Sequence, residues 1–343
     1  MELLTLSLSN CRNFALKKID FDKNLTVIIG PNGSGKSNIL EAISLLCGIR
    51  SMRIETDLDL VKFGKSEAKI ESRVISQSEK KILTINFLVV DERFIKKSYY
   101  IDSLKKRLVD LTDYISIVVF HPEDLDLVIG SPSVRRHHLD SLLSLVDRDY
   151  WRNISAYSKI VVRRNRVLQR ISEGKAKTSE LSFWDERLLE HAKYIFKKRE
   201  EYFEFLNFIN APRDLSWQYQ ASELSEEKLV KNRDRDIAAQ MTLSGPHRDD
   251  YRFMQKSRDL AFFGSRGEQR MAVLYFKLAQ LDYLGKKRGN RPILALDDIF
   301  SELDWEHREA ILSIIGNQQT IITAAEQESV PKNLLGKAKV VEL

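Results

Sequence analysis

A glycine-rich segment near the start of the chain combines residue types that bind phosphate. Residues 30–37 read GPNGSGKS and fit the pattern G-x-x-x-x-G-K-[ST]. Glycines let backbone N–H groups face phosphate oxygens, the lysine neutralises the β- and γ-phosphates, and the serine hydroxyl ligates Mg²⁺. The apolar run 25–29 before the segment and the helical spacing of 38–46 after it supply the strand and helix that the pattern requires. We predict a site for ATP and Mg²⁺ formed by Gly30, Asn32, Gly33, Gly35, Lys36, Ser37 and Asn38.

An apolar stretch that ends in two acidic residues is the second chemical feature. Residues 291–298 read RPILALDD, which is typical of a Walker B strand beside a P-loop. Asp297 is expected to hold Mg²⁺ through water, and Asp298 to orient or deprotonate the attacking water. Asp298 and Lys36 are therefore the predicted catalytic residues. Without the P-loop, the same stretch would equally suit a strand followed by a polar turn.

A third motif opens a predicted long helix over residues 268–284. Residues 264–269 read GSRGEQ, in which Ser265 and Glu268 have the spacing of a capping box. The same hydroxyl and free N–H groups can also bind an anion. The segment resembles the ABC-type signature LSGGQ, and residues 301–304 (SELD) look like a D-loop. The order of the four motifs predicts a homodimer in which Ser265 and Gly267 complete the ATP site of the opposite subunit.

The hydrophobic periodicity indicates which elements position these motifs. Alternation over residues 4–8, β-branched and aromatic segments over 69–100, and the run 114–120 predict strands. Residues 133–211 have helical periodicity, and the polar stretch 222–236 is expected to loop out, with strand-like material around Leu243. Later predicted elements are a strand at 293–296, a helix at 304–315 and a strand at 320–323.

These elements predict an α/β fold of two lobes. The fold class is an ABC-type P-loop ATPase head, a mixed β-sheet lobe with a central helix, plus an inserted mostly helical lobe and no long coiled coil. Lobe I is expected to comprise residues 1–124 and 280–343, with the P-loop, Walker B strand and D-loop. Lobe II is expected to comprise residues 125–279 and to carry the signature motif.

Composition limits the classes of function. The chain has 343 residues, and its 55 basic against 49 acidic residues give a net charge of +6, which mildly favours a polyanionic partner. Its two cysteines, Cys11 and Cys47, form neither a disulfide framework nor a metal-binding spacing, as expected in a reducing compartment. Apolar runs such as 83–90 are too short to span a bilayer. A cytoplasmic protein without a membrane partner is predicted.

A basic stretch is the best candidate for DNA contact. Residues 151–170 hold six cations and no acid, and Arg163, Arg164 and Arg166 are predicted to bind DNA phosphates. The alternative is an ordinary solvated helix face. The clusters Arg135–Arg136 and 197–199 compete for the same role.

Beyond these motifs, the chain resembles the RecF family of bacterial recombination mediators, relatives of the Rad50 and SMC heads. The resemblance covers nearly the whole chain through segments at 10–14 (NCRNF), 30–43 (GPNGSGKSNILEAI), 120–140 (FHPEDLDLVIGSPSVRRHHLD), 157–168 (YSKIVVRRNRVL), 244–250 (SGPHRDD), 265–270 (SRGEQR) and 294–304 (LALDDIFSELD). It implies an ATP-dependent homodimer that binds DNA near gaps or junctions, hydrolyses ATP slowly, and works with RecR and RecO to load recombinase. It also implies that Arg12 and Asn13 lie near the adenine or ribose of ATP.

Other interpretations remain open at this level. ABC transporters carry a switch histidine after the last strand, where this chain has residues 323–326 (TAAE), so efficient hydrolysis is in doubt. His247 and Arg248 could act in catalysis, although a lone histidine is more often structural. A transporter-type ATPase, or a binding module in which ATP serves only as a dimerisation ligand, are the rival functions.

Overall fold

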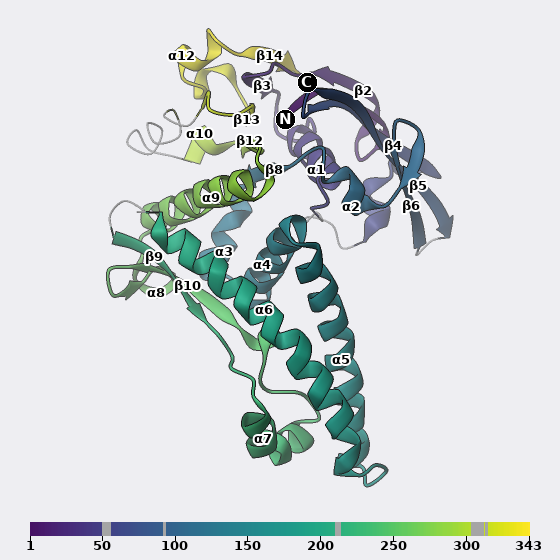
Figure 1. Ribbon diagram of the computed structural model, residues 1–343. Coiled ribbons are helices and arrows are strands. Elements are labelled where there is room, and N and C mark those ends of the chain that lie inside the picture. The colour runs from purple at the N-terminus through teal and green to yellow at the C-terminus, as the bar shows by residue number, and fades with distance from the viewer. Residues whose placement is uncertain (50–55, 92–93, 210–213, 303–311, 313–314) are drawn as a thin grey trace. The chain divides into compact units, whose positions relative to one another are not determined.

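The computed structural model describes residues 1–49, 56–91, 94–209, 214–302, 312 and 315–343 (Figure 1). The chain divides into two compact units. Unit 1 comprises residues 1–124 and 277–343, and unit 2 comprises residues 125–276.

A parallel sheet of five strands positions the chemical motifs of unit 1. Its order is β14 (Lys339–Glu342), β3 (Leu25–Ile29), β13 (Thr320–Ala324), β12 (Ile293–Asp297) and β8 (Ile117–Phe120). All neighbouring pairs are parallel, so the carboxyl ends of the strands share one edge. Strands β12, β13 and β8 are wholly buried, which explains their continuous apolar sequences.

An antiparallel sheet forms the second layer of unit 1. Its order is β2 (Phe14–Asp20), β1 (Glu2–Cys11), β4 (Glu67–Ser76), β5 (Glu79–Asp91), β6 (Phe94–Ile101) and β7 (Leu104–Lys106). Strand β4 alternates between buried and accessible residues, so one face of this sheet is apolar.

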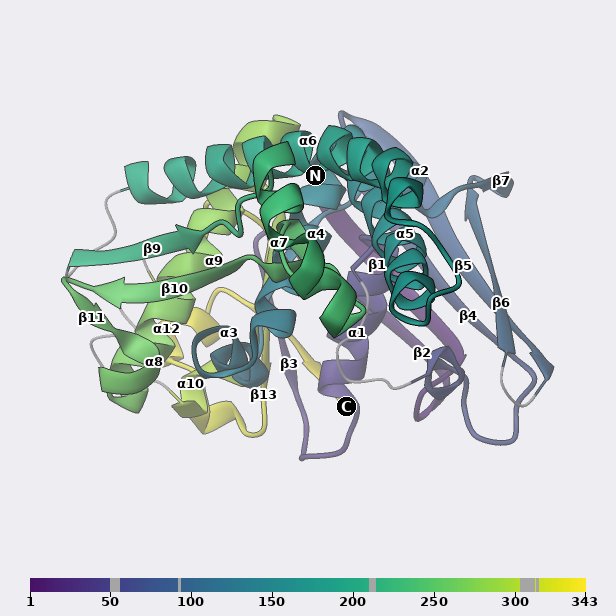
Figure 2. The same cartoon turned by 90° about the horizontal axis from the view of Figure 1, so that it is seen from below.

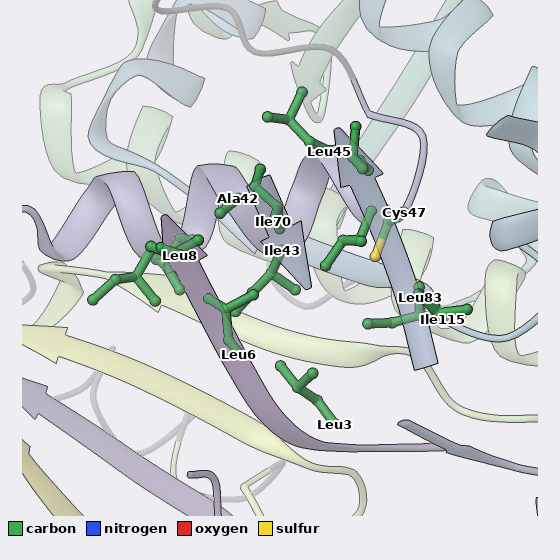
Figure 3. Packing of buried hydrophobic residues seen from close by; sticks show 14 of the residues in the cluster. Leu3, Leu6, Leu8, Ala42, Ile43, Leu45, Cys47, Ile70, Leu83 and Ile115 are labelled. Carbon is green, nitrogen blue, oxygen red and sulfur yellow. The ribbon is translucent and has the colours of Figure 1, made fainter. Parts of the chain in front are cut away.

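Helix α1 (Lys36–Leu46) lies in the core of unit 1. Figure 3 shows Leu3, Leu6 and Leu8 of β1 beside Ala42 and Ile43 of this helix. The helix is buried along most of its length, so the P-loop at its N-terminus is anchored in the largest apolar cluster. The remaining elements of unit 1 are short: η1 (Asp57–Leu60), α2 (Leu108–Leu111), α10 (Ile299–Glu302), η6 (Gln327–Ser329) and α12 (Lys332–Leu335).

Unit 2 is built on long helices. Helices α4 (Pro132–Val146), α5 (Arg148–Ser172) and α6 (Ser182–Phe208) supply most of it, and α5 begins at the N-cap Asp147, whose side chain accepts from two backbone N–H groups. The shorter helices of unit 2 are α3 (Asp126–Ile129), η3 (Thr178–Leu181), α7 (Glu226–Ala239), η5 (Pro246–Arg248) and α8 (Leu260–Phe263). Helix η2 (Pro122–Leu125) begins in unit 1 and ends at the first residue of unit 2. Helix α9 (Arg266–Arg288) begins in unit 2 and ends in unit 1.

Unit 2 also contains a small antiparallel sheet. Figure 2 shows its three strands side by side, in the order β11 (Arg258–Asp259), β10 (Asp250–Gln255) and β9 (Leu215–Gln220). Aromatic residues of this sheet, Trp217 and Phe253, pack on Phe276 of α9. The sheet therefore packs against α9 through aromatic side chains.

Two details of the predicted element order are wrong. The polar stretch 222–236 was predicted to loop out, but α7 covers most of it because Ser225 caps the helix through Lys228 N–H (3.1 Å) and Leu229 is buried. The strand-like material predicted around Leu243 is a bend before η5, and the strands lie at β9 and β10 instead. The helix predicted at 304–315 lies almost wholly outside the described residues.

The fold class is confirmed. Buried parallel strands 25–29, 293–297 and 320–324 match the predicted ones within a residue, and the mostly helical second unit is present. Among the described residues the longest helix has 27 residues, in keeping with the absence of a long coiled coil. None of the helices in the described ranges has the length and apolar character needed to cross a membrane.

Candidate nucleotide site and basic surface

The P-loop turns tightly between β3 and α1. Gly33 and Gly35 have φ angles of 85° and 105°, a left-handed conformation that favours glycine. A Cβ on Gly35 would lie only 2.5 Å from the Phe14 ring and 2.7 Å from the Asn13 amide. Glycine is therefore required at position 35 by both its backbone conformation and its neighbours.

Lys36 is folded into this loop. Its ammonium donates to the carbonyl of Gly30 at 2.5 Å and to that of Pro31 at 3.1 Å. The side chain is buried. These contacts keep a positive charge at the centre of the turn that begins α1, where backbone N–H groups also favour an anion.

Three polar side chains contact Asp297 at the carboxyl edge of the parallel sheet. Its Oδ1 accepts from Ser37 Oγ at 3.2 Å and from Thr323 Oγ1 at 2.7 Å, and its Oδ2 lies 3.1 Å from Nδ1 of His121. Burial would raise the pKa of Asp297, but His121 and the two hydroxyls outweigh it and lower that pKa to about 2. The carboxylate is therefore ionised at neutral pH.

This edge suits Mg²⁺ better than a transition metal. Within the described ranges, no group of three or more His, Cys, Asp or Glu side chains could hold a metal ion. Ser37 and Asp297 instead offer two oxygens beside the P-loop, separated by 3.2 Å. Mg²⁺ commonly binds one or two protein oxygens, water and substrate phosphate, so the donor set fits that ion.

Asp298 is held in an unusual backbone conformation. Its φ angle is 51°, and its N–H donates to Thr323 Oγ1 at 3.0 Å. Aspartate tolerates the left-handed region better than most residues, and such strain is frequent at functional sites. Because Thr323 also donates to Asp297, one hydroxyl fixes both acidic residues.

Arg12 and Asn13 lie against the P-loop helix. The Arg12 guanidinium forms a bidentate pair with Glu41 of α1, at 2.6 and 2.8 Å, and also contacts the Asp59 carbonyl. Asn13 donates to Ser34 O at 3.0 Å and accepts from Asn38 at 2.9 Å. The structure thus brings both residues to the P-loop, with the charge of Arg12 already paired.

The signature segment caps α9. Ser265 N–H donates to Glu268 Oε2 at 2.7 Å, and Glu268 N–H donates to Ser265 Oγ at 3.3 Å, so the capping box is confirmed. Ser265 and Gly267 are exposed, and open space surrounds the Cα of Gly267. Of the predicted D-loop, residues 303–304 and the side chains of 301–302 lie outside the described residues.

The prediction that Arg164 binds DNA is wrong. Its side chain is fully buried, where it donates to Asp185 at 2.7 Å, to Asp236 at 2.7 Å and to Thr242 at 2.9 Å. Its i±4 neighbours Ile160 and Leu168 are also buried, so helical spacing places it on the inner face of α5. A phosphate cannot reach a guanidinium in that position.

The other predicted arginines of α5 are exposed. Arg163 lies over the Trp184 ring at 5.7 Å, and Arg166 is accessible to solvent. The two competing basic clusters also contain both buried and accessible residues. Arg135 and Arg199 point into ion pairs, with Asp250 and Asp249 respectively, whereas their neighbours in sequence are more accessible.

The prediction from sequence missed His121 and Thr323 as parts of the Asp297 environment. Each lies at the carboxyl end of a strand that pairs with β12: Thr323 pairs with Asp297, and His121 follows Phe120, the partner of Leu296. A polar residue at the end of a predicted buried strand is the signal that could have identified both. His247, by contrast, has both ring nitrogens in contact with Tyr157 and the Thr242 carbonyl.

A P-loop before a buried helix, with paired aspartates after a neighbouring parallel strand, defines an ABC-type P-loop ATPase head. A sequence model of the family described as RecF/RecN/SMC N terminal domain matches residues 2–338. The chain belongs to this family, and the curated relatives described below are RecF proteins. The predicted resemblance is thereby confirmed.

The similarity covers nearly the full length of both this chain and its relatives. The DNA replication and repair protein RecF of Moorella thermoacetica is 35% identical over 100% of this chain and 95% of the relative. RecF of Clostridium tetani is 34% identical over 98% of this chain and 96% of the relative. A solved structure of the recombination mediator protein RecF-ATPrS in the RecFOR pathway has a TM-score of 0.86 and 30% identity, and covers 96% of this chain and 94% of that one.

Proposed function

We propose that this chain is an ATP-dependent DNA-binding protein of recombinational repair and replication-fork maintenance. The main supporting observation is that Lys36, Ser37 and Asp297 meet at the carboxyl edge of the parallel sheet. A solved relative described as RecF-ATP also favours ATP as the ligand. ATP binding drives formation of a homodimer, and slow hydrolysis resets it.

The P-loop binds the phosphates of ATP. Backbone N–H groups of the turn and the Lys36 ammonium supply positive charge, while Arg12 and Asn13 lie beside the loop for the adenine or ribose. Ser37 and Asp297 would hold Mg²⁺, Ser37 through its hydroxyl and Asp297 through water. When bound, the ion neutralises charge on the phosphate oxygens.

Asp298 orients or deprotonates the attacking water. Its backbone is fixed by Thr323, and its side chain is partly accessible, so the carboxylate can accept a proton from a water molecule. Thr323 begins the segment in which ABC transporters carry a switch histidine. Its hydroxyl is bound to Asp297. With a threonine in place of that histidine, we infer a weak, DNA-stimulated ATPase that acts as a switch.

A second copy of the chain completes the nucleotide site. Ser265 and Gly267 are exposed at the N-terminus of α9, so both can contact the γ-phosphate bound by the opposite subunit. The capping box uses the Ser265 hydroxyl as an acceptor, which leaves its proton for a phosphate oxygen.

The ATP-bound dimer binds DNA near gaps or junctions between single and double strands and promotes recombinase loading. RecR and RecO are the expected partners, since solved relatives are described as members of the RecFOR pathway. The cytoplasm is the expected location.

Sedimentation velocity with ATP and gapped DNA, added separately and together, tests this function. We expect a monomer alone, a dimer with ATP and Mg²⁺, and a dimer bound to DNA with all components. Single-turnover phosphate release, with and without DNA, then measures hydrolysis. A chain that stays monomeric with ATP, or that hydrolyses none of it, contradicts the proposed cycle.

Ser265→Arg tests the shared site. The large cation should occupy the space of the partner's γ-phosphate, so ATP binding by the monomer should persist while dimerisation is lost. Arg266→Ala is a suitable control because Arg266 is the exposed neighbour of Ser265 in sequence. A dimer that survives Ser265→Arg moves the shared site elsewhere.

A further inference from the structure

Two sequence motifs without an assigned role lie together in unit 2. Arg135, from the segment GSPSVRR, forms a bidentate pair with Asp250, from SGPHRDD, at 2.6 and 2.9 Å. Arg199 of α6 joins the same assembly, since it donates to Asp249 at 2.6 Å and to the Pro246 carbonyl at 2.8 Å. The two motifs therefore form one cross-linked platform.

The turn at η5 is held rigidly on this platform. His247 contacts the Tyr157 hydroxyl at 2.8 Å and the Thr242 carbonyl at 2.9 Å. Gly245 has a φ angle of 120°, and a Cβ there would collide with the Tyr157 hydroxyl. Arg248, the next residue after His247, is consequently carried on a backbone with little freedom to move.

Two arginines of the platform differ from the rest because they have no acidic partner. In the part of the chain that the structure describes, neither Arg136 nor Arg248 forms an ion pair with a carboxylate. Arg136 donates to the carbonyl of Asp249 at 2.9 Å, and Arg248 contacts the sulfur of Met241 at 3.1 Å. Because Asp249 directly follows Arg248, the first contact places the Arg136 guanidinium against the backbone beside Arg248.

The positive charges of Arg136 and Arg248 affect the pKa of a neighbouring histidine in unit 2. Burial is the main cause that lowers the pKa of His247 to about 4, and the positive charges of Arg248 and Arg136 contribute to the same shift. Arg248 is exposed and Arg136 is partly exposed, so their remaining N–H donors can reach a ligand. Arg135, Arg164 and Arg199 cannot, because carboxylates already bind them.

We propose that Arg136 and Arg248 form a phosphate-binding pair that holds the backbone of nucleic acid. The planar guanidinium matches the geometry of phosphate oxygens, and an immobile turn reduces the entropy lost when it binds. This inference rests on the proposed DNA-binding function and deepens it. It places one contact at the junction of α4 and η5, in addition to the exposed arginines of α5.

The test compares two charge-matched double variants of the full chain. Arg136→Gln with Arg248→Gln removes the proposed pair. Arg107→Gln with Arg187→Gln removes two exposed arginines that already have acidic partners, Asp110 and Glu190. Fluorescence anisotropy with a gapped duplex, ATP and Mg²⁺ measures DNA affinity over a range of salt concentrations, and a titration without DNA measures ATP affinity.

We expect the first double variant to lose on the order of tenfold in DNA affinity. The slope of log affinity against log salt should fall by about 0.9 for each lost contact. The control variant should match the wild type, and ATP affinity should be unchanged in both. Arg248→Gln alone should show the DNA effect in part, which guards against misfolding caused by changing Arg136.

Each contrary result has a distinct meaning. If the wild type binds DNA and the Arg136 and Arg248 variant binds it with the same affinity and salt slope, the pair is not a nucleic-acid contact. If ATP affinity falls while DNA affinity does not, the pair binds nucleotide phosphate and the assignment is overturned. If the wild type itself fails to bind DNA, the proposed function fails, and this inference fails with it.

Discussion

Buried charge is held in two different ways in the two units. In unit 1, the buried Lys36 contacts two backbone carbonyls and, within the described residues, no carboxylate. In unit 2, the buried Arg164 contacts Asp185 and Asp236, and the buried Arg199 contacts Asp140 and Asp249. Lys36 of the P-loop is a buried cation whose charge is available to a ligand, whereas Arg164 and Arg199 are buried cations that carboxylates neutralise.

This difference separates a binding site from a structural network. A buried charge without a partner of opposite sign is costly, so it persists where a ligand supplies the missing charge. A charge that is paired on several sides has no attraction left for a ligand, and removing it leaves its partners buried and unpaired. Substitution of Lys36 should therefore affect nucleotide chemistry, and substitution of Arg164 or Arg199 should affect stability.

Arg164→Met should have the largest effect on stability. It leaves Asp236, which is 1% exposed, without its cation, and breaking such a buried pair costs about 3–5 kcal/mol. Urea denaturation monitored by circular dichroism measures the change in the free energy of unfolding. Arg163→Met is the matched control, since its side chain is exposed and its effect should stay within about 0.5 kcal/mol. Equal effects of the two substitutions would remove the distinction between the units.

Asp298→Asn should slow hydrolysis by at least about a hundredfold, because the attacking water loses its acceptor. ATP binding should persist, since Asp297 still has its contacts with Ser37 and Thr323, and the dimer should accumulate. Single-turnover phosphate release and sedimentation measure the two effects. Turnover at the wild-type rate would show that Asp298 has no catalytic role.

Lys36→Met should weaken ATP binding by about ten- to a hundredfold or more, because it removes the cation of the P-loop. The fold should change little, since Lys36 donates only to carbonyls and no buried carboxylate loses its partner. Isothermal titration calorimetry measures the affinity, and thermal unfolding without nucleotide checks the stability. Unchanged ATP affinity would place the nucleotide site elsewhere.

How well a site could be predicted from the sequence depends on whether its contacts are local or join distant segments. The P-loop could be predicted because its residues act through local backbone geometry: Gly35 needs a left-handed φ angle, and Lys36 binds carbonyls five and six residues away. The contacts of Asp297 with Thr323 and His121 could not, because they depend on the order of strands far apart in sequence.

Charged residues on helices were harder to interpret than motifs. The basic composition of 151–170 suggested one solvated face, yet Arg164 shares its face with Tyr157 and Leu168 and points inward. Helical spacing could have shown this, but a charged residue on an apolar face is recognised only when its acidic partners are known. Asp185 and Asp236 lie 21 and 72 residues further along the chain.

The smallest expected effect tests whether α5 contributes to DNA binding once Arg164 is set aside. Arg163 and Arg166 are exposed on this helix, so each can neutralise a DNA phosphate and release counterions. Replacing both by alanine should lower the slope of log DNA affinity against log salt by at most about 1.8, since each contact contributes about 0.9. The loss should be uniform across DNA sequences, because phosphate contacts do not read bases, and stability should change little, because neither residue is buried. Anisotropy titrations with duplexes of two unrelated sequences, each at several salt concentrations, measure both quantities. If the slope and the affinity stay at their wild-type values, the exposed side of α5 is only a solvated helix face, and the phosphate contacts of unit 2 must lie elsewhere.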